Sequence, residues 1–541
     1  MPAGLADANL PGTLHELLER QARARPDQEF VRSDGRVWTY RQLDQHARMV
    51  ARALSRRGIG RGDRVLLMMQ SSELYLALWF GISRLGAVEV PVNSAYRGEI
   101  LRHILRTAAA KVALVAREYW EQFEQPAQGL FAAGDIIDPQ SDELVWNEAQ
   151  AAALTETHPD VEVLASDPAC VVFTSGTTGL SKGVVMSHRH QITFGRSFSE
   201  VVELGATDVA YNFLPFFHVA AKFLAIGAML AGARMIMRPV FSASHFWRDV
   251  REGQATLCIA VGGLCHILNS APPAVDDADN PLRLIYSVPV PWEFKESFEA
   301  RFGLRLIEAY GRTESNLNIC CHLNEETPRG SCGRASPHFD VSIRDENGVE
   351  VPCGVAGEIW VRAKEPNTTM IGYLGPPELT AGTMHGAWLK SGDRAHVDER
   401  GYFYFADRIK DAIRRRGENI SSVEVERVLN AHPSVAEVAV VPVKAEVGED
   451  EVKAVVILKP GASLAPEALL EFAVQSLPYF MVPRFIEFKA DLPRTPTMRV
   501  KKDELREEGR TQATWDCEKA GLRITRRGLE RIMANGSSAH G

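Results

Sequence analysis

Hydrophobic residues recur along the first 120 residues in two alternating patterns. Over residues 41–58, apolar side chains return every three or four positions, which is the period of a helix with one buried face. The short apolar run at residues 64–69 is typical of a buried strand. The same patterns predict helices at 13–24, 72–85 and from Glu99, and strands at 88–92 and 111–115. This alternation predicts an α/β fold, with a mostly parallel sheet covered by helices on both faces.

The pattern changes near residue 410. Beyond it, helices are predicted at 422–431 and 466–477, and strands at 435–443 and 452–458. These elements no longer repeat the alternation, and about a hundred residues is a common domain size. We therefore predict a large N-terminal domain of alternating strands and helices (1–409) and a small α+β C-terminal domain (410–510). Residues 511–541 are predicted to be a flexible tail, because the final ANGSSAHG is typical of a frayed terminus.

A polar segment interrupts the hydrophobic pattern at residues 171–188, VVFTSGTTGLSKGVVMSH. Apolar runs at 170–173 and 184–186 flank it, which predicts two buried strands joined by a loop. Glycines permit close backbone approach, hydroxyls donate hydrogen bonds, and Lys182 is a flexible cation. Successive backbone amides in such a loop can form a nest for a polyphosphate. The spacing differs from Walker A, because only two residues separate Gly176 from Gly179 and Lys182 precedes a glycine.

Clusters of glycine and hydroxyl residues also occur in linkers and turns. This segment, however, resembles the phosphate loop of the adenylate-forming superfamily, which includes acyl-CoA synthetases, luciferases and nonribosomal-peptide adenylation domains. It matches every fixed position of TSGTTGxPKG except one, where Ser181 replaces proline. Losing that proline is expected to loosen the loop without removing a phosphate ligand. The resemblance assigns ATP binding to Thr174, Ser175, Gly176, Thr177, Thr178, Gly179 and Lys182.

A histidine follows in the apolar segment LPFFHV, residues 214–219. A lone histidine in such a setting is more often a core residue than a ligand. Its order and distance after the phosphate loop are those of the histidine that closes over the acyl site in the superfamily. The resemblance therefore makes His218 a candidate catalytic residue.

The segment LRLIEAYGRTESNLN, residues 304–318, predicts a strand that delivers polar residues at its end. Ligands of open α/β sheets bind beyond the carboxyl ends of strands. The segment resembles the YGxTE motif of the superfamily. That resemblance implies that Tyr310 stacks on adenine beside Gly311, that Thr313 contacts phosphate, and that Glu314 binds magnesium, which prefers a carboxylate together with substrate phosphates.

Two later segments complete the resemblance. SGD and DRIK are similar to the ribose-binding aspartate and the hinge of the superfamily. This makes Asp393 the ribose ligand, assisted by Arg408, and Lys410 the hinge of a mobile C-terminal domain. In RRGENISSVEVE, the resemblance assigns CoA to Arg416, Gly417 and Glu418, although a solvated basic surface would use similar residues.

Two segments depart from the superfamily. LPRTPTMRVKK resembles PRTxTGKxxK, but Arg499 stands where the catalytic lysine is usual. If the segment is extended, Lys501 faces the same way about 6.6 Å further along, so either Arg499 or Lys501 is predicted to supply the catalytic cation. In LIYSVPVP, residues 284–291, bulky side chains replace a glycine-rich stretch, which is expected to narrow the acyl pocket.

Length, composition and charge exclude several classes of protein. A chain of 541 residues exceeds what one hydrophobic core usually serves. The formal charge of −8 argues against nucleic acid as the main partner. Eight cysteines without a CxxC motif favour a reducing compartment over a disulfide or zinc framework. The N-terminus lacks a secretory signal, and the apolar stretch 223–237 is too short to span a bilayer. We expect a cytoplasmic protein without an integral membrane segment, and a homodimer is left open.

The resemblance implies an ATP-dependent carboxylate–CoA ligase that uses ATP, Mg²⁺, CoA and a small carboxylic acid. An acyl-adenylate and pyrophosphate would form first, and CoA would then displace AMP. The sequence and spacing around PFFHV, DRIK and RRGENISSVEVE are most similar to those of crotonobetaine/carnitine-CoA ligases. This similarity does not identify the carboxylic acid substrate. Two alternatives remain. One is an adenylating enzyme that passes the acyl group to an amine or carrier protein. The other, motivated by Arg499, is a nucleotide- or acyl-binding pseudoenzyme.

Overall fold

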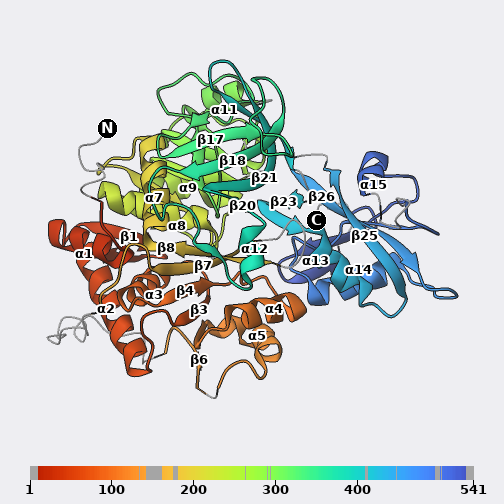
Figure 1. Cartoon of the computed structure of the whole chain (residues 1–541), viewed down its shortest axis with the longest axis horizontal. Coiled ribbons are helices and arrows are strands. Elements are labelled where there is room, and N and C mark those ends of the chain that lie inside the picture. Colours follow the sequence, from red (N-terminus) through yellow and green to blue (C-terminus); the bar gives the residue numbers. More distant parts are fainter. Residues whose placement is uncertain are drawn as a thin grey trace, which may run out of the picture.

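The computed structural model contains a large N-terminal domain and a small C-terminal domain, which confirms the predicted fold class (Figure 1). The small domain, in blue, lies at one side of the large one. The structure describes residues 10–132, 134–141, 161–174, 181–261, 264–288, 290–292, 294–408, 412–445, 448–493, 500 and 502–531.

The first sheet of the large domain has seven strands. Six are parallel, and the edge strand β2 pairs antiparallel with β1. Its order is β13 (Arg305–Ile307), β12 (Leu284–Val288), β11 (Leu257–Val261), β9 (Val209–Asn212), β10 (Arg234–Met237), β1 (Glu29–Ser33) and β2 (Arg36–Thr39).

A second seven-stranded sheet mixes both directions. β7 and β8 are antiparallel neighbours, as are β8 and β19, and the other pairs are parallel. The predicted phosphate loop therefore joins two adjacent strands, although residues 175–180 lie outside the described part of the chain. The order is β19 (Gly372–Tyr373), β8 (Lys182–Ser187), β7 (Pro168–Thr174), β4 (Val88–Pro91), β3 (Arg64–Met68), β5 (Val112–Val115) and β6 (Ile136–Ile137).

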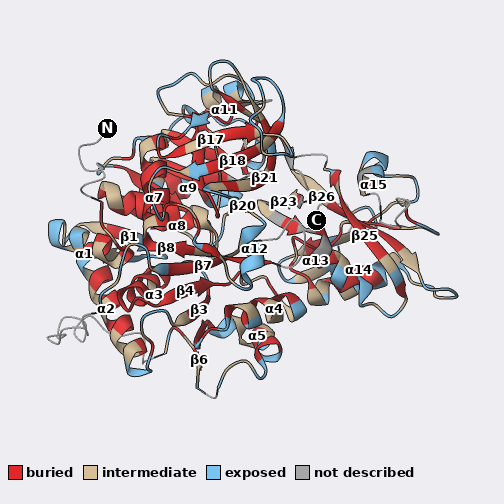
Figure 2. Ribbon diagram, in the orientation of Figure 1, coloured by how far each residue is buried: buried red, intermediate tan, exposed pale blue. Residues whose placement is uncertain are grey.

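Helices join the two sheets into one core. A capping box of Thr39 and Gln42 starts α2 (Tyr40–Arg56), close to the predicted start. Two pairs of packed helices share a hydrophobic cluster with strands of both sheets: α2 with α3 (Glu73–Arg84), and α7 (His188–Val202) with α8 (Val219–Ala231). Figure 2 shows that these helices are largely buried. Gly195 allows α7 and α8 to approach, because a Cβ there would lie 2.4 Å from Ile226 Cγ2. The other helices of this domain are α1 (Leu14–Ala24), η2 (Arg117–Tyr119), α4 (Gly98–Ala108), α5 (Trp120–Ala127), α9 (Ala243–Gly253), α10 (Leu264–Ser270), α11 (Lys295–Phe302) and α12 (Pro377–Ala381).

The single strand predicted within 304–318 is divided between two sheets. β13 ends at Ile307, and the chain then forms the antiparallel hairpin of β14 (Ala309–Arg312) and β15 (Asn316–Cys320), which β16 (Arg334–Ala335) extends. The break is at Glu308, whose carbonyl accepts a hydrogen bond from Cys321 N. A further antiparallel sheet contains β17 (Phe339–Arg344), β18 (Gly357–Ala363), β20 (Met384–His385), β21 (Trp388–Val397) and β22 (Phe403–Arg408).

The C-terminal domain begins with the hairpin of β23 (Ala412–Arg415) and β24 (Glu418–Ser421). Its main sheet has the order β25 (Val435–Lys444), β26 (Asp450–Leu458), β27 (Phe485–Phe488) and β28 (Trp515–Asp516). Its helices are α13 (Ser422–Asn430), α14 (Pro466–Ser476) and α15 (Lys502–Glu508). The domain limits 1–409 and 410–510 stay a prediction, since residues 409–411 are outside the described ranges.

The structure differs from the tail predicted from residue 511. β28 extends the main sheet beside β27, and β29 (Leu522–Thr525) forms a hairpin with β30 (Gly528–Arg531). The reason is tertiary: Arg484 Nε and Nη2 each lie 3.1 Å from a carboxylate oxygen of Asp516, and Cys517 is buried. The chain is therefore folded as far as Arg531, and residues 532–541 lie beyond the described part.

Within the described residues, no helix has both the length and the apolar character needed to cross a membrane.

Candidate active site

A cavity of about 1860 Å³ is lined by residues of both domains. This volume exceeds the size usual for one small ligand, so it suits several substrates at once. Ten of the predicted site residues line it, namely Thr174, His218, Tyr310, Gly311, Thr313, Glu314, Asp393, Arg416, Gly417 and Glu418. Lys182 does not line the cavity but contacts Tyr373, which is bonded to Glu314.

The nucleoside candidates meet on one side of the cavity. Tyr310 Oη donates a 2.7 Å hydrogen bond to Asp393 Oδ2, which joins the YGxTE and SGD segments across 83 residues. Gly311 is needed for the close β14–β15 pairing, because a Cβ there would lie 2.5 Å from Asn316 O. The backbone of Arg408 pairs with Asp393 between β22 and β21. The YGxTE and SGD segments, predicted to bind the nucleoside, therefore lie next to each other.

Arg312 connects the two acidic candidates and was not found from the sequence. Its Nη2 lies 3.2 Å from Glu314 Oε1, and its Nη1 lies 3.6 Å from Asp393 Oδ2. It occupies the variable position of YGxTE, so the motif itself gave no signal. The guanidinium balances two carboxylates that would otherwise repel each other.

Glu314 is buried and ionised. Burial alone would raise its pKa, but Arg312 and a hydrogen bond from Tyr373 outweigh burial, so the pKa is lowered. Tyr373 Oη donates to Glu314 Oε1 at 2.8 Å, and Lys182 Nζ lies 4.9 Å from the centre of the Tyr373 ring. Tyr373, also missed by the sequence analysis, therefore brings the end of the phosphate loop next to Glu314.

The predicted magnesium ligand has the chemistry that this ion prefers. Glu314 presents ionised, hard oxygen donors at the cavity, and Mg²⁺ usually takes one or two carboxylates together with substrate phosphates. In the described ranges, no group of three or more His, Cys, Asp or Glu residues could hold a metal alone. Magnesium at Glu314 would complete its coordination with oxygens of the substrate and water.

The side of the cavity nearest α8 is apolar. β12 places Tyr286 and Val288 in its wall, two positions apart on one face of the strand, within the bulky segment 284–291. Glu308 also lines the cavity, and burial raises its pKa to about 7 despite hydrogen bonds from Val290 N and Trp292 Nε1. The apolar wall is completed by Phe194, Phe213, Val219, Phe223, Ile259, Leu264 and Leu317.

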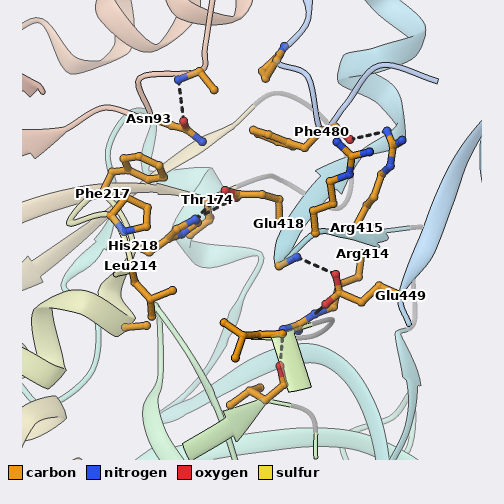
Figure 3. Close-up of a pocket in the computed structure, with 18 of the residues that line it drawn as sticks. Asn93, Thr174, Leu214, Phe217, His218, Arg414, Arg415, Glu418, Glu449 and Phe480 are labelled. Atoms are coloured by element: carbon orange, nitrogen blue, oxygen red, sulfur yellow. Dashed lines mark hydrogen bonds and ion pairs between the residues drawn. The ribbon is translucent and has the colours of Figure 1, made fainter. Parts of the chain in front are cut away.

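His218 lies where the domains meet (Figure 3). Its Nε2 is 3.0 Å from Glu418 Oε1 on β24. Partial burial lowers the pKa of His218, but the Glu418 carboxylate outweighs burial and the net pKa is raised. Because a raised pKa favours the charged imidazole, the stabilisation from this ion pair is present just below the ordinary pKa of histidine and is lost as pH rises through the raised pKa.

The β23–β24 hairpin is held by further contacts visible in Figure 3. Arg414 Nη2 donates to Val288 O at 3.1 Å across the domain boundary, and its Nε lies 3.0 Å from Glu449 Oε1. Gly417 N also donates to Glu449, at 2.7 Å. The hairpin, with Glu418, is therefore the part of the small domain that faces His218.

Ser181 makes another contact between the domains. Its N and Oγ both donate to Glu424 Oε1 at 2.6 Å, and both residues are buried. Proline at this position, which is usual in the superfamily, could provide neither donor. Ser181 therefore hydrogen-bonds to α13 of the small domain, a contact that a proline could not make. The sequence did not predict this contact, because Glu424 is 243 residues away.

Several predicted residues cannot be placed. Ser175–Gly179, Lys410, Arg499 and Lys501 lie outside the described residues, as does the side chain of Arg408. The described neighbours of the predicted cation, Val500 and Lys502, do not line the cavity. Lys502 Nζ instead contacts Ser422 Oγ at 2.8 Å and Glu426 Oε1 at 2.6 Å within the small domain.

Thr174, Tyr310, Glu314 and Asp393 line a cavity shared with a small domain, which is the arrangement expected of an adenylate-forming enzyme. Comparison with known proteins agrees: residues 18–374 match the AMP-binding enzyme family and residues 424–499 match the AMP-binding enzyme C-terminal domain. The chain belongs to this family.

The chain is similar to proteins that are named for several different activities. The chain is 30% identical over 482 residues to the crotonobetaine/carnitine–CoA ligase of Salmonella paratyphi A (strain ATCC 9150 / SARB42), covering 87% of this chain and 93% of the relative. A fatty acyl-CoA synthetase of Mycobacterium tuberculosis aligns with a TM-score of 0.67 at 27% identity, over 92% and 98% of the two chains. An amide bond synthetase of Marinactinospora thermotolerans aligns with a TM-score of 0.81 at 24% identity, over 91% and 99%.

Proposed function

We propose that this protein is an ATP-dependent carboxylate–CoA ligase that works through an acyl-adenylate. The proposal rests on one observation, which is that a single cavity brings together several parts that such a reaction needs. The hydrogen-bonded pair Tyr310–Asp393 and the carboxylate of Glu314 line it, as do an apolar wall and the His218–Glu418 contact between the domains. The relation to a CoA ligase at 30% identity supports CoA as the acceptor.

In the first half-reaction, a carboxylate oxygen of the acid attacks the α-phosphorus of ATP, and the bond to pyrophosphate breaks. Asp393 and Tyr310 hold the nucleoside, and Thr174 and Lys182 bind phosphates. Magnesium, when bound at Glu314, neutralises charge on the polyphosphate. Arg499 or Lys501 supplies a cation to the carboxylate and α-phosphate. Catalysis of this kind depends on alignment and on stabilisation of charge.

In the second half-reaction, the CoA thiolate attacks the acyl carbonyl, and the bond to AMP breaks. The described arrangement presents the β23–β24 hairpin to His218, while Val500 and Lys502 line no part of the cavity. This supports assigning the arrangement to thioester formation. The small domain would then rotate at Lys410 to bring Arg499 or Lys501 to the site for adenylation.

The acid is proposed to carry an uncharged acyl group that is largely apolar or aromatic. Support comes from the aromatic wall, in which the Phe194 and Phe223 rings stack on each other at 5.5 Å instead of enclosing a cation. Tyr286 and Glu308 are two residues of this wall that carry polar groups. Tyr286 Oη is buried and has no hydrogen-bond partner among the described residues. A buried hydroxyl without a partner is unfavourable, so we propose that it bonds to a polar substituent on the acyl group.

Tyr286→Phe should change substrate choice without loss of stability. The kcat/KM for aromatic acids with a ring hydroxyl or carbonyl should fall by about tenfold, whereas unsubstituted acids should be unaffected. The melting temperature should stay the same or rise. Tyr211→Phe is the matched control: Tyr211 Oη donates to Asp249 Oδ2 at 3.0 Å and the residue does not line the cavity, so this variant should lower stability and leave selectivity unchanged.

Parallel kinetics over a panel of acids give the measurement. Equal effects of Tyr286→Phe on every acid would contradict the assignment. A clear preference of the parent for acids with a trimethylammonium group would instead make the aromatic wall and Glu308 a cation site.

The proposed function is tested with purified protein, ATP, magnesium and a hydroxylamine trap over a panel of carboxylates. Hydroxamate formation with one or more acids is expected, and a thioester should replace it when CoA is added. Transfer only to amines or to a carrier protein would favour the first alternative. Absence of adenylation with every acid would favour the pseudoenzyme.

A further inference from the structure

The folded part of the chain continues past the segment that matches the family's C-terminal domain. The family match stops at residue 499, whereas folded structure continues to Arg531. The β29–β30 hairpin packs on α14, with Ile524 buried in the same hydrophobic cluster as Leu470 and Leu477. The extension, residues 510–531, is therefore an integral part of the small domain.

The extension reaches the cavity. Ile524, Thr525, Arg526 and Gly528 all line it, next to Tyr479. The Arg526 guanidinium carbon lies 5.5 Å from the centre of the Tyr479 ring, and its Nε lies 3.4 Å from Tyr479 Oη. The extension thus adds a cation and an aromatic contact to the cavity.

A second arginine contacts the same ring. Arg416, which follows β23, has its guanidinium carbon 5.7 Å from the centre of Tyr479. Neither Arg416 nor Arg526 forms an ion pair with any described carboxylate. Two of the acids that line the cavity pair with other arginines, Glu449 with Arg414 and Glu451 with Arg415. Further cations line the cavity, namely Lys444, Arg506 and Arg510.

This arrangement has the properties of a site for a phosphorylated nucleotide. Arginine binds phosphate through a planar fork of donors, and two arginines beside one ring concentrate positive charge where an anion would relieve their repulsion. Tyr479 and the guanidinium planes provide surfaces on which a base can stack. The same cavity extends to His218 and Glu418, where the acyl group would be transferred.

Resting on the proposed function, we propose that the extension forms the binding site for the phosphorylated nucleotide end of CoA, with Arg526 as its anchor beside Arg416. The thiol end would run through the cavity towards His218. Arg526 lies outside the two segments that match the family models.

The test compares Arg526→Ala with Arg526→Lys and with the control Arg523→Ala. Arg523 is exposed on the same hairpin and does not line the cavity. Arg526→Ala should raise KM for CoA by about tenfold or more, because a charge-assisted hydrogen bond is lost. Its KM for pantetheine, which lacks the nucleotide and phosphates, should not change. Acid-dependent ATP–pyrophosphate exchange, measured without CoA, should also match the parent. Arg526→Lys should recover part of the affinity, and Arg523→Ala should behave as the parent.

Direct titration with adenosine 3′,5′-bisphosphate needs no turnover and separates this proposal from the proposed function. Tighter binding to the parent than to Arg526→Ala supports the site even if CoA proves not to be the acceptor. An unchanged KM for CoA in Arg526→Ala, an equal rise for pantetheine, or absence of bisphosphate binding to the parent would overturn it.

Discussion

Glu314→Ala should reduce adenylate formation by about 100-fold or more. Removing a charged group that stabilises a reacting phosphate in a preorganised site typically costs about 2.7 to 4 kcal/mol. Glu314 is suited to this role because its carboxylate is buried at the cavity and kept ionised by Arg312. The measurement is acid-dependent pyrophosphate release at saturating ATP over a range of magnesium concentrations.

Tyr373→Phe is the matched control for this prediction. It removes the 2.8 Å hydrogen bond to Glu314 but leaves the carboxylate in place, so the loss should stay below tenfold. Glu314→Gln keeps the size and an acceptor but removes the charge, and it should resemble Glu314→Ala. Activity of Glu314→Ala within tenfold of the parent, in protein with a parental melting temperature, would remove Glu314 from the metal role.

Lys222→Met should lower the free energy of unfolding by about 3 to 5 kcal/mol, which is typical when one partner of a buried ion pair is removed. Lys222 Nζ lies 2.8 and 2.6 Å from the two carboxylate oxygens of Glu89, and the side chains are 2% and 0% exposed. Tyr75 Oη donates to the same carboxylate at 2.6 Å. Without Lys222, the Glu89 charge would remain buried without its cation.

The double variant Lys222→Met/Glu89→Leu tests the cause. It removes both charges, so it should recover a large part of the lost stability. Chemical denaturation, followed in the transition of the N-terminal domain, gives the comparison. A loss below about 1 kcal/mol for Lys222→Met would show that Glu89 is protonated or solvated in the folded protein. Because α8 begins directly after His218, the pair also fixes the position of the acyl side of the site.

The local elements were predictable because their signals are local. The helix expected at 41–58 is α2, Tyr40–Arg56, since its apolar period and its Thr39 cap lie in adjacent residues. The strand expected within 304–318 was wrong in extent, because the change of sheet at Glu308 depends on a hydrogen bond from Cys321. The expected tail was wrong up to Arg531, because β28 needs β27 as a partner.

In the candidate active site, too, short motifs were predictable from the sequence, whereas contacts between distant segments were not. Motifs predicted Tyr310 and Asp393, and the structure joins them by a hydrogen bond. No motif predicts Tyr373 or Glu424, because their contacts with Glu314 and Ser181 form only after distant segments fold together. The chemical roles of the motif residues stay predictions, as does the choice between Arg499 and Lys501.

A single-turnover experiment tests whether the protein forms an acyl-adenylate and transfers the acyl group to CoA. The enzyme is mixed with ATP, magnesium and an accepted acid without CoA, and the bound product is identified by mass spectrometry before and after a chase with CoA. We expect enzyme-bound acyl-AMP first, and then acyl-CoA and AMP in equal amounts after the chase. Acyl-AMP that persists with CoA but is consumed by an amine, or ATP consumption that never yields acyl-AMP, would contradict it.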